Sequence, residues 1–194
     1  MIFFISKNKL TEHSSTVTSL LINEDQLLIS GSFDSTIKIW NLTEQQSFAS
    51  LIDNVDGIKS LIINPKNSAQ LISGTADGKI KIWNIITKQL IKTIDAHRYS
   101  VNALAINKNN QLISGSGDNE IKIWDLETSS PLRSLLGHNN PITSLIINEK
   151  NEIISGSSDK MIKIWNIETG EVKTLMNSDS VYSLIINKNN ELIS

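Results

Sequence analysis

Residues 115–124 read Gly-Ser-Gly-Asp-Asn-Glu-Ile-Lys-Ile-Trp, and a stretch of the same form occurs four times in the chain of 194 residues. Each copy ends in Ile-Lys-Ile-Trp, at Trp40, Trp83, Trp124 and Trp165. Successive tryptophans lie 43, 41 and 41 residues apart. A period near 41 residues marks a repeat architecture in which each repeat is one unit of supersecondary structure. The repeat therefore decides the fold class.

Each repeat contains four short segments rich in Ile, Val and Leu, and most of the links between them are rich in Gly, Asn, Asp and Ser. Segments of four to six residues without a 3.6-residue apolar period predict β-strands. Asp77-Gly78 is a strong signal for a tight hairpin. In the first repeat the segments are residues 17–22, 27–30, 37–40 and 48–52. The first two segments return a fifth time, starting at Val181 and ending at Ser194.

Four antiparallel strands per repeat predict the blades of a β-propeller. Strand alternation places Lys38 and Trp40 on one face of the sheet and Ile37 and Ile39 on the other. A single blade of about 40 residues buries too little surface to be stable alone. Both faces must therefore pack against neighbouring blades, and the lysine stem packs while its ammonium group reaches solvent.

The repeated Ser-Gly-Ser/Thr-X-Asp-X-X-Ile-Lys-Ile-Trp stretch resembles the WD40 repeat family over essentially the whole chain. The residue after Trp is Asp125 once and Asn41, Asn84 or Asn166 elsewhere, and Asn also tolerates turn geometry. The resemblance implies an all-β propeller with four complete blades and an incomplete fifth. The expected blades are approximately residues 14–53, 54–96, 97–137, 138–176 and, in part, 177–194, with an N-terminal strand over 3–10 that belongs to a preceding blade.

All three histidines occupy one phase of the repeat, four residues before a first strand. In WD40 proteins this His forms a hydrogen-bonded tetrad with the second-strand Ser, the hairpin Asp and the Trp. The second repeat has Asn54 in place of the histidine, so its network is expected to be weaker. The implied tetrads are His13-Ser30-Asp34-Trp40, Asn54-Ser73-Asp77-Trp83, His97-Ser114-Asp118-Trp124 and His138-Ser155-Asp159-Trp165.

Ser, His and Asp in one place also describe a hydrolase triad. Three full copies argue against catalysis, because a catalytic site is needed once, and no Gly-X-Ser-X-Gly nucleophile elbow is present. The histidines lie one or two blades apart, which does not suit a metal site. We therefore expect no enzyme activity, no catalytic residue, no metal and no cofactor.

The composition limits the remaining classes of function. The net charge of −2 leaves no basic excess to neutralise phosphates, so nucleic acid is not expected as a partner. The chain has no cysteine, which fits an intracellular protein, and we expect a cytoplasmic one. Nothing approaches the roughly 20 apolar residues of a membrane span.

The expected function is that of a non-catalytic scaffold that binds other proteins or peptides. Rigid strands would present the loops on the rim where the His-side loops and Asp hairpins emerge. Two alternatives remain open: the regulatory or targeting part of a longer multidomain enzyme, and recognition of a phosphopeptide through Lys59 and Arg98. The candidate partner-face residues are Phe33, Asp56, Lys59, Arg98, Tyr99 and Tyr182.

Seven blades, the common number in the family, would need roughly 290 residues at this repeat length. Three explanations are compatible with the 194 residues: a fragment of a longer protein, a small five-bladed ring, or a ring completed by another copy. An open arc would expose an apolar blade face at each end, and self-association through these faces is expected.

Overall fold

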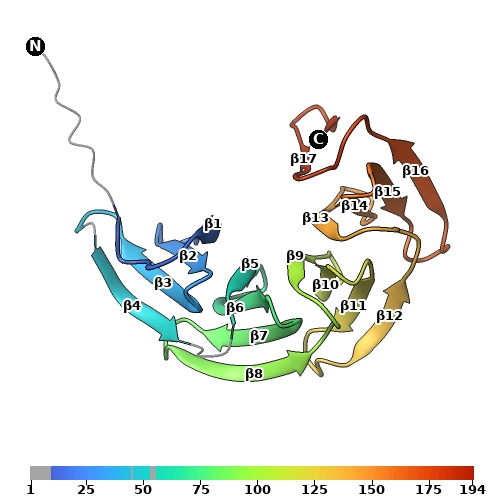
Figure 1. The fold of residues 1–194 in the computed structure, drawn as a ribbon. Coiled ribbons are helices and arrows are strands. Elements are labelled where there is room, and N and C mark those ends of the chain that lie inside the picture. Colours follow the sequence, from blue (N-terminus) through green and yellow to red (C-terminus); the bar gives the residue numbers. More distant parts are fainter. Residues whose placement is uncertain (1–9, 45, 53–55) are drawn as a thin grey trace, which may run out of the picture.

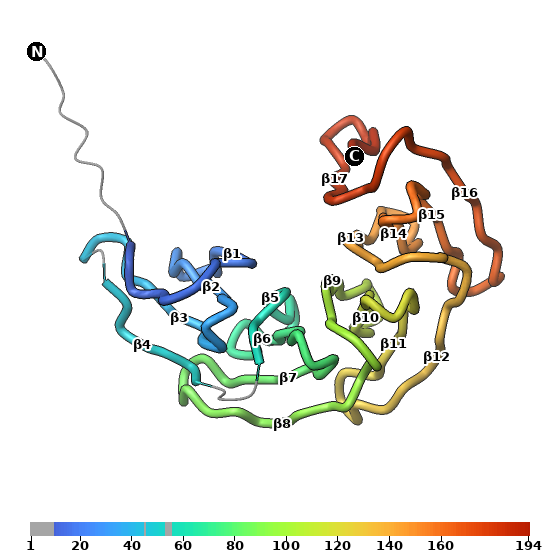
Figure 2. Tube along the Cα trace, viewed as in Figure 1, coloured from blue at the N-terminus to red at the C-terminus, as the bar shows by residue number. Residues whose placement is uncertain are grey.

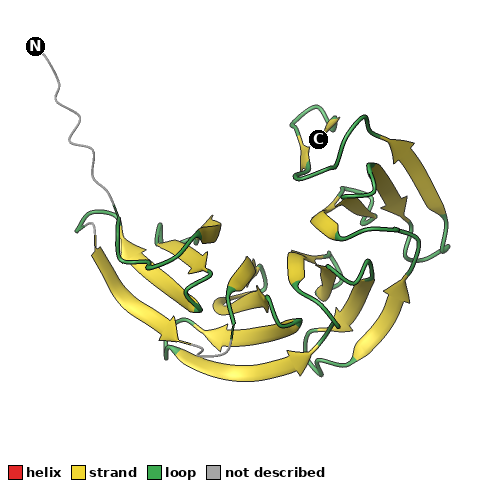
Figure 3. Ribbon diagram, in the orientation of Figure 1, coloured by secondary structure: helices red, strands yellow, loops and turns green. Residues whose placement is uncertain are grey.

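The structure, a computed structural model, describes residues 10–44, 46–52 and 56–194. These residues form strands joined by loops and turns (Figure 3). The expected N-terminal strand over 3–10 lies, apart from Leu10, outside the described residues. No helix in the described ranges has the length and apolar character that a membrane crossing requires.

Each repeat forms one antiparallel sheet whose strands pair in chain order. The first sheet contains β1 (Val17–Ile22), β2 (Leu28–Ser32), β3 (Thr36–Asn41) and β4 (Gln46–Ile52). The second contains β5 (Ile58–Asn64), β6 (Asn67–Thr75), β7 (Lys79–Asn84) and β8 (Gln89–Asp95). The third contains β9 (Val101–Ile106), β10 (Gln111–Ser116), β11 (Ile121–Asp125) and β12 (Pro131–Leu135). The fourth contains β13 (Ile142–Ile147), β14 (Ile153–Ser157), β15 (Met161–Trp165) and β16 (Val172–Met176). A two-stranded sheet of β17 (Ile185–Ile186) and β18 (Leu192–Ile193) follows.

The sheets stand next to one another along an arc, with β1, β5, β9 and β13 on the inside and β4, β8, β12 and β16 on the outside (Figure 1). The chain runs from one end of the arc to the other in sequence order (Figure 2). Contacts between successive sheets run through the inner strands β1, β5, β9 and β13. The predicted all-β propeller, with four complete blades and part of a fifth, is confirmed.

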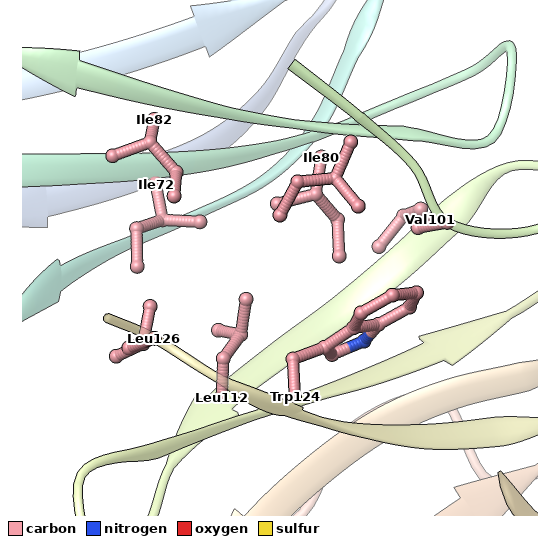
Figure 4. Close-up of a cluster of buried hydrophobic side chains, with 9 residues drawn as sticks. Ile72, Ile80, Ile82, Val101, Leu112, Trp124 and Leu126 are labelled. Carbon is pink, nitrogen blue, oxygen red and sulfur yellow. The ribbon is translucent and has the colours of Figure 1, made fainter. Parts of the chain in front are cut away.

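The hydrophobic core lies between blades and follows the alternation in Ile-Lys-Ile-Trp. Between the second and third blades, Trp124 packs against the face that carries Ile80 and Ile82 (Figure 4). Trp83 joins the cluster of Ile37 and Ile39 in the same way, one blade earlier. Each of these tryptophans thus covers the isoleucine face of the preceding blade, which explains why a single blade needs its neighbours.

A glycine in the second strand sets the spacing between blades. A Cβ atom at Gly115 would lie 2.5 Å from Cγ2 of Ile142 in the next blade, and one at Gly31 would lie 2.5 Å from Cγ2 of Ile58. Any side chain there would overlap with the inner strand of the neighbour. The Ser-Gly-Ser/Thr phrase therefore serves close packing between blades as well as the hairpin that follows it.

The fifth first strand is shorter than predicted. The sequence favours a strand from Val181, but β17 contains only Ile185 and Ile186. In the first blade Val17 pairs with Ser32, two residues after the repeat position that Ser194 occupies. The start of the predicted strand lies against the fourth blade, where the backbone N–H of Val181 donates to Ser157 O at 3.1 Å.

The insertion in the second repeat also folds differently from its sequence pattern, which suggests a polar turn over residues 64–69. Asn64 and Asn67 are paired, so the turn contains Pro65 and Lys66 while β6 extends to nine residues. The side-chain Oδ1 of Asn64 accepts a hydrogen bond from the backbone N–H of Lys66 at 2.9 Å. The two extra residues therefore lengthen the hairpin between β5 and β6, with a register irregularity between Ile63 and Asn64.

Candidate functional site

Three blades bring the implied tetrad together inside the sheet. In the first blade, Ser30 Oγ lies 2.7 Å from Trp40 Nε1 and 2.7 Å from His13 Nε2. Nδ1 of His13 lies 2.8 Å from Asp34 Oδ2. The third and fourth blades repeat this arrangement with Ser–Trp distances of 2.8 Å, Ser–His distances of 2.7 Å and closest His–Asp distances of 3.0 and 2.8 Å. Their members are Ser114, Trp124, His97 and Asp118, and Ser155, Trp165, His138 and Asp159.

The direction of the hydrogen bonds follows from the donor inventory. The indole N–H of Trp can only donate, so the Ser hydroxyl accepts from it. A carboxylate accepts, so Nδ1 of the histidine carries the proton toward Asp, and Nε2 accepts the hydroxyl proton of Ser. The chain of donors thus runs from Trp through Ser and His to Asp. A hydrolase triad has the same Ser-His-Asp order, but Ser30, Ser114 and Ser155 are at most 2% exposed, which leaves no room for a substrate at Oγ.

The electrostatics favour the neutral form of two tetrad histidines, His97 and His138, and the ionised form of the tetrad aspartates. Burial lowers the pKa of His97 and His138, although the neighbouring Asp118 and Asp159 act in the opposite direction. Burial would raise the pKa of Asp34, but hydrogen bonds from Thr36, His13 and two backbone amides outweigh it and hold that pKa well below its usual range. A neutral His between Ser and an ionised Asp is the state that the donor chain requires.

The described part of the second blade keeps the Ser–Trp hydrogen bond and also holds its hairpin aspartate. Ser73 accepts the indole hydrogen bond of Trp83 at 2.9 Å, as in the other blades. Asn54, predicted to replace the histidine, lies outside the described residues. Among the described residues, Asp77 is held by the hydroxyl of Thr75 and by Lys79, whose Nζ lies 3.1 Å from Oδ2.

The same blade corrects the expectation that each Ile-Lys-Ile-Trp lysine reaches solvent. Lys38 and Lys163 donate to hydroxyl groups of the outer strand, and both are partly exposed. Lys81 is only 4% exposed, and burial lowers its pKa. A buried ammonium group costs free energy unless it is satisfied by polar partners, so this position is more constrained than its repeat pattern suggests.

Acidification is expected to destabilise the chain in two stages. The pKa values of His97 and His138 lie below the ordinary value of 6.5, so the unfolded chain takes up these protons first and stability falls from about pH 6.5 downward. A second loss of stability begins as the pH falls to about 3.8, the ordinary pKa of aspartate, because Asp118 and Asp159 have lowered pKa values in the fold. Thermal unfolding followed by circular dichroism across this range measures both stages. A double variant, His97→Gln with His138→Gln, should flatten the first stage, and an unchanged slope would contradict the assignment.

A periodic asparagine escaped the sequence analysis. It ends the first strand of each repeat, and its Oδ1 accepts a backbone hydrogen bond from the following turn, for example from Leu27 to Asn23 at 2.8 Å and from Glu152 to Asn148 at 2.9 Å. These asparagines stand 39 to 43 residues apart, at positions 23, 64, 107, 148 and 187, and this spacing is visible in the sequence and could have revealed them. They cap the turns on the rim opposite the Asp hairpins, which is a structural role.

The residue after each Trp has a similar role, which explains why Asn and Asp interchange there. Oδ1 of Asn41 accepts hydrogen bonds from the backbone of Thr43 and Glu44. Oδ1 of Asp125 accepts the equivalent bonds from Glu127 and Thr128. The turn needs a side-chain oxygen acceptor and does not need the charge, so Asn serves as well as Asp.

We define the hairpin rim as the turns over residues 33–35, 76–78, 117–119 and 158–160 together with the loops over 14–16, 56–57, 98–100, 139–141 and 178–180. The Asp hairpins and the His-side loops meet here, as the hydrogen bond from the backbone N–H of Phe33 to Thr16 O at 2.9 Å shows. The described turns and loops are polar and solvent-facing at most positions. This rim carries most of the predicted partner-face residues.

The structure brings two of the six predicted partner-face residues into contact. Nζ of Lys59 lies 4.6 Å from the ring centroid of Phe33, across the junction of the first and second blades. Arg98 and Tyr99 follow in the loop of the third blade, where Tyr99 is 59% exposed. Tyr182 lies on the partial fifth blade, and Asp56 lies in the loop before β5, where its charge helps to raise the pKa of Lys79. The six residues therefore do not form one patch.

Across the described ranges, His, Asp and Glu side chains do not gather in the groups of three that a metal ion requires. Each histidine is engaged by a Ser and an Asp of its own blade. The arrangement supports a rigid scaffold.

Comparison with known proteins agrees with this geometry. The sequence model of a family described as "Nucleolar protein 10-like, N-terminal domain", a β-propeller, matches residues 7–194. The solved structure titled "Structure of U3-55K" superimposes with a TM-score of 0.82 at 21% identity, covering 89% of this chain and 55% of that one. The structure titled "Crystal structure of RRP9 WD40 repeats" gives a TM-score of 0.80 at 22% identity, covering 86% and 53%. The chain thus spans about half the length of these structures, and the predicted resemblance to WD40 propellers is confirmed.

Proposed function

This chain belongs to the nucleolar protein 10-like N-terminal β-propeller family, and from that premise we propose that it is a non-catalytic scaffold that binds other proteins through its hairpin rim. The observation that carries the proposal is the internal saturation of every complete tetrad. Each tetrad Ser is held by both Trp and His, and each tetrad His is held by both Ser and Asp. Side chains used in this way stabilise the blades and are not free for bond chemistry.

The rim supports the interaction part of the proposal. It consists of short turns anchored by the tetrads: the backbone N–H of Arg98 donates to Asp118 Oδ2 at 3.0 Å, and that of Asn139 donates to Asp159 Oδ2 at 2.9 Å. Phe33 and Tyr99 project from these anchored turns, 42% and 59% exposed. Aromatic residues on a pre-organised surface are typical anchors of protein interfaces.

The experiment compares two apolar-to-polar changes on opposite rims. The double variant Phe33→Ser with Tyr99→Ser alters the hairpin rim, and Ile86→Ser, at a residue 75% exposed in the turn after β7, is the matched control. Proteins that co-purify with the tagged chain are quantified by mass spectrometry. We expect the control to keep the wild-type set and the double variant to lose most of it. Equal retention by both variants would rule out the hairpin rim as the binding surface.

The location within the cell follows the same reasoning. The family's description names a nucleolar protein, which supports a nucleolar location as the alternative to the cytoplasmic one expected from the composition. Fluorescence imaging of the tagged chain separates the two. The expected absence of nucleic-acid partners, based on the net charge of −2, stays a prediction.

A further inference from the structure

The second blade departs from the others in how it bonds to its neighbour. In three blades the second residue of the first strand donates a side-chain hydrogen bond to a backbone carbonyl of the next blade. Thr18 donates to Ile58 O, Asn102 to Ile142 O and Thr143 to Val181 O. In the second blade that position is Lys59. The bond is formed instead by Ser60, whose Oγ donates to Val101 O at 3.1 Å. The hydrogen bond between the second and third blades is thus kept, and the Lys59 side chain does not form it.

The Lys59 side chain contacts an aromatic ring of the first blade. The Lys59 ammonium group stacks over Phe33 at 4.6 Å. Gly57 makes this possible, since a Cβ atom there would lie 2.5 Å from Cδ1 of Phe33. Other repeats have Ala76, Gly117 or Ser158 at the position of Phe33. Three sequence changes in two blades therefore cooperate to place one half-exposed ring and one cation at the junction of the first two blades.

The charges of the rim distinguish this junction from its surroundings. Lys79 lies 3.1 Å from Asp77, and Lys160 lies 3.8 Å from Asp179. In the described part of the chain, no carboxylate forms an ion pair with Lys59 or Arg98. The loop with Arg98 and Tyr99 lies next along the rim, because it contacts the hairpin of the second blade: a Cβ atom at Gly78 would lie 2.9 Å from Tyr99 O. In the described part of the chain, Lys59 and Arg98 thus lack a carboxylate ion-pair partner, and each lies beside an exposed aromatic residue, Phe33 and Tyr99 respectively.

We propose that this stretch of the hairpin rim, formed by Phe33, Lys59, Arg98 and Tyr99, binds an acidic, extended segment of a protein partner. An apolar side chain of the segment lies on the Phe33 ring, and flanking carboxylates face Lys59 and Arg98. Complementary charge favours such a segment over a basic one, and an extended chain advances about 3.3 Å per residue, so a few residues reach from one blade to the next. The proposal rests on the proposed scaffold function and adds the chemistry of the partner.

The test uses three fluorescein-labelled peptides of ten residues and fluorescence anisotropy with the wild-type chain. The first peptide alternates Glu and Asp around a central Phe, the second has Ser in place of Phe, and the third has Lys and Arg in place of the acidic residues. We expect the first to bind most tightly and the third not to bind. Binding should weaken at 0.5 M salt, because exposed ion pairs are screened.

Variants then locate the binding site. Lys59→Met and Arg98→Met should each weaken binding of the first peptide about two- to fivefold, as expected for exposed ion pairs. Phe33→Ala should weaken it about tenfold, as expected for an aromatic anchor. Lys66→Met and Lys150→Met remove exposed cations from turns on the opposite rim and should leave binding unchanged.

Three outcomes would overturn the proposal: no binding of the acidic peptide, equal loss in the opposite-rim variants, or tighter binding of a ten-residue oligouridylate RNA of similar charge. Each of these leaves the scaffold function standing if the hairpin-rim variant of the co-purification experiment still loses its partners. Conversely, peptide binding at Phe33 and Lys59 without any loss of co-purifying proteins would retain the peptide site and rule out the hairpin rim as the surface that binds those proteins.

Discussion

Trp124→Ala is expected to lower the free energy of unfolding by about 3–5 kcal/mol, the range found for large aromatic residues removed from a core. Trp124 is 4% exposed and packs with Ile72, Ile80 and Leu112 across the junction of the second and third blades. Its loss removes both this contact and the hydrogen bond to Ser114 at 2.8 Å. Urea unfolding followed by circular dichroism measures the change.

Trp40→Ala is the matched control, because Trp40 has the same repeat position and the same kind of hydrogen bond but no isoleucine face of a preceding blade in the described residues. It borders an open pocket of about 260 Å³, together with Leu10, Val17 and Leu20. Trp40 is itself buried, but its removal should cost less than that of Trp124, toward the lower end of the same range of about 3–5 kcal/mol. Equal losses in the two variants would show that packing between blades is not what makes Trp124 important.

Ser155→Ala is expected to cost about 2–4 kcal/mol although it removes a single oxygen atom. Ser155 is fully buried and bonds to both Trp165 Nε1, at 2.8 Å, and His138 Nε2, at 2.7 Å. Two buried polar atoms lose their partner together, and each unsatisfied group costs about 1–3 kcal/mol. Urea unfolding of the variant measures this loss.

A double-mutant cycle separates the hydrogen bond from general packing. Trp165→Phe keeps an aromatic ring but lacks the indole N–H that bonds to Ser155. If the tetrad acts as a unit, the combined variant should lose less than the sum of the single losses, with a coupling energy of about 0.5–3 kcal/mol. Strict additivity would mean that Ser155 and Trp165 stabilise the blade independently, contrary to the donor chain described above.

Much of the fold could be predicted because each local sequence pattern occurs again in every repeat. Strand length, apolar content and Gly-Asp turns agree in each repeat, and such agreement between levels specifies a fold strongly. The prediction of the fifth first strand was wrong, because strand pairing and not the strand propensity of the sequence decides where that strand begins. Val181 has a favourable strand sequence, yet strand structure begins at Ile185, and the backbone N–H of Val181 bonds to Ser157 O of the fourth blade.

The candidate partner surface could be predicted less well. Phe33 and Tyr99 stood out because they are large residues at small-residue positions of the repeat. Their environment could not be read in the same way: Phe33 meets Lys59 of another blade, whereas Tyr182, which has the repeat position of Lys59, stands alone in the described part of the partial fifth blade and is 78% exposed. Equivalent positions in a repeat therefore do not guarantee equivalent surroundings.

The sequence by itself determined the repeat, the four strands of each blade and the spacing of Ser, Asp and Trp within it, because these depend on backbone periodicity and on residues of one blade. Only the tertiary structure decided which cations are buried and which are free. Lys81 is buried, Lys79 pairs with Asp77, and Lys59 stacks on Phe33 while Ser60 forms the inter-blade bond. The physical reason is that a lysine side chain reaches several ångströms from its strand. Its partner therefore depends on the distance between neighbouring blades, and the 41-residue sequence period does not specify that distance.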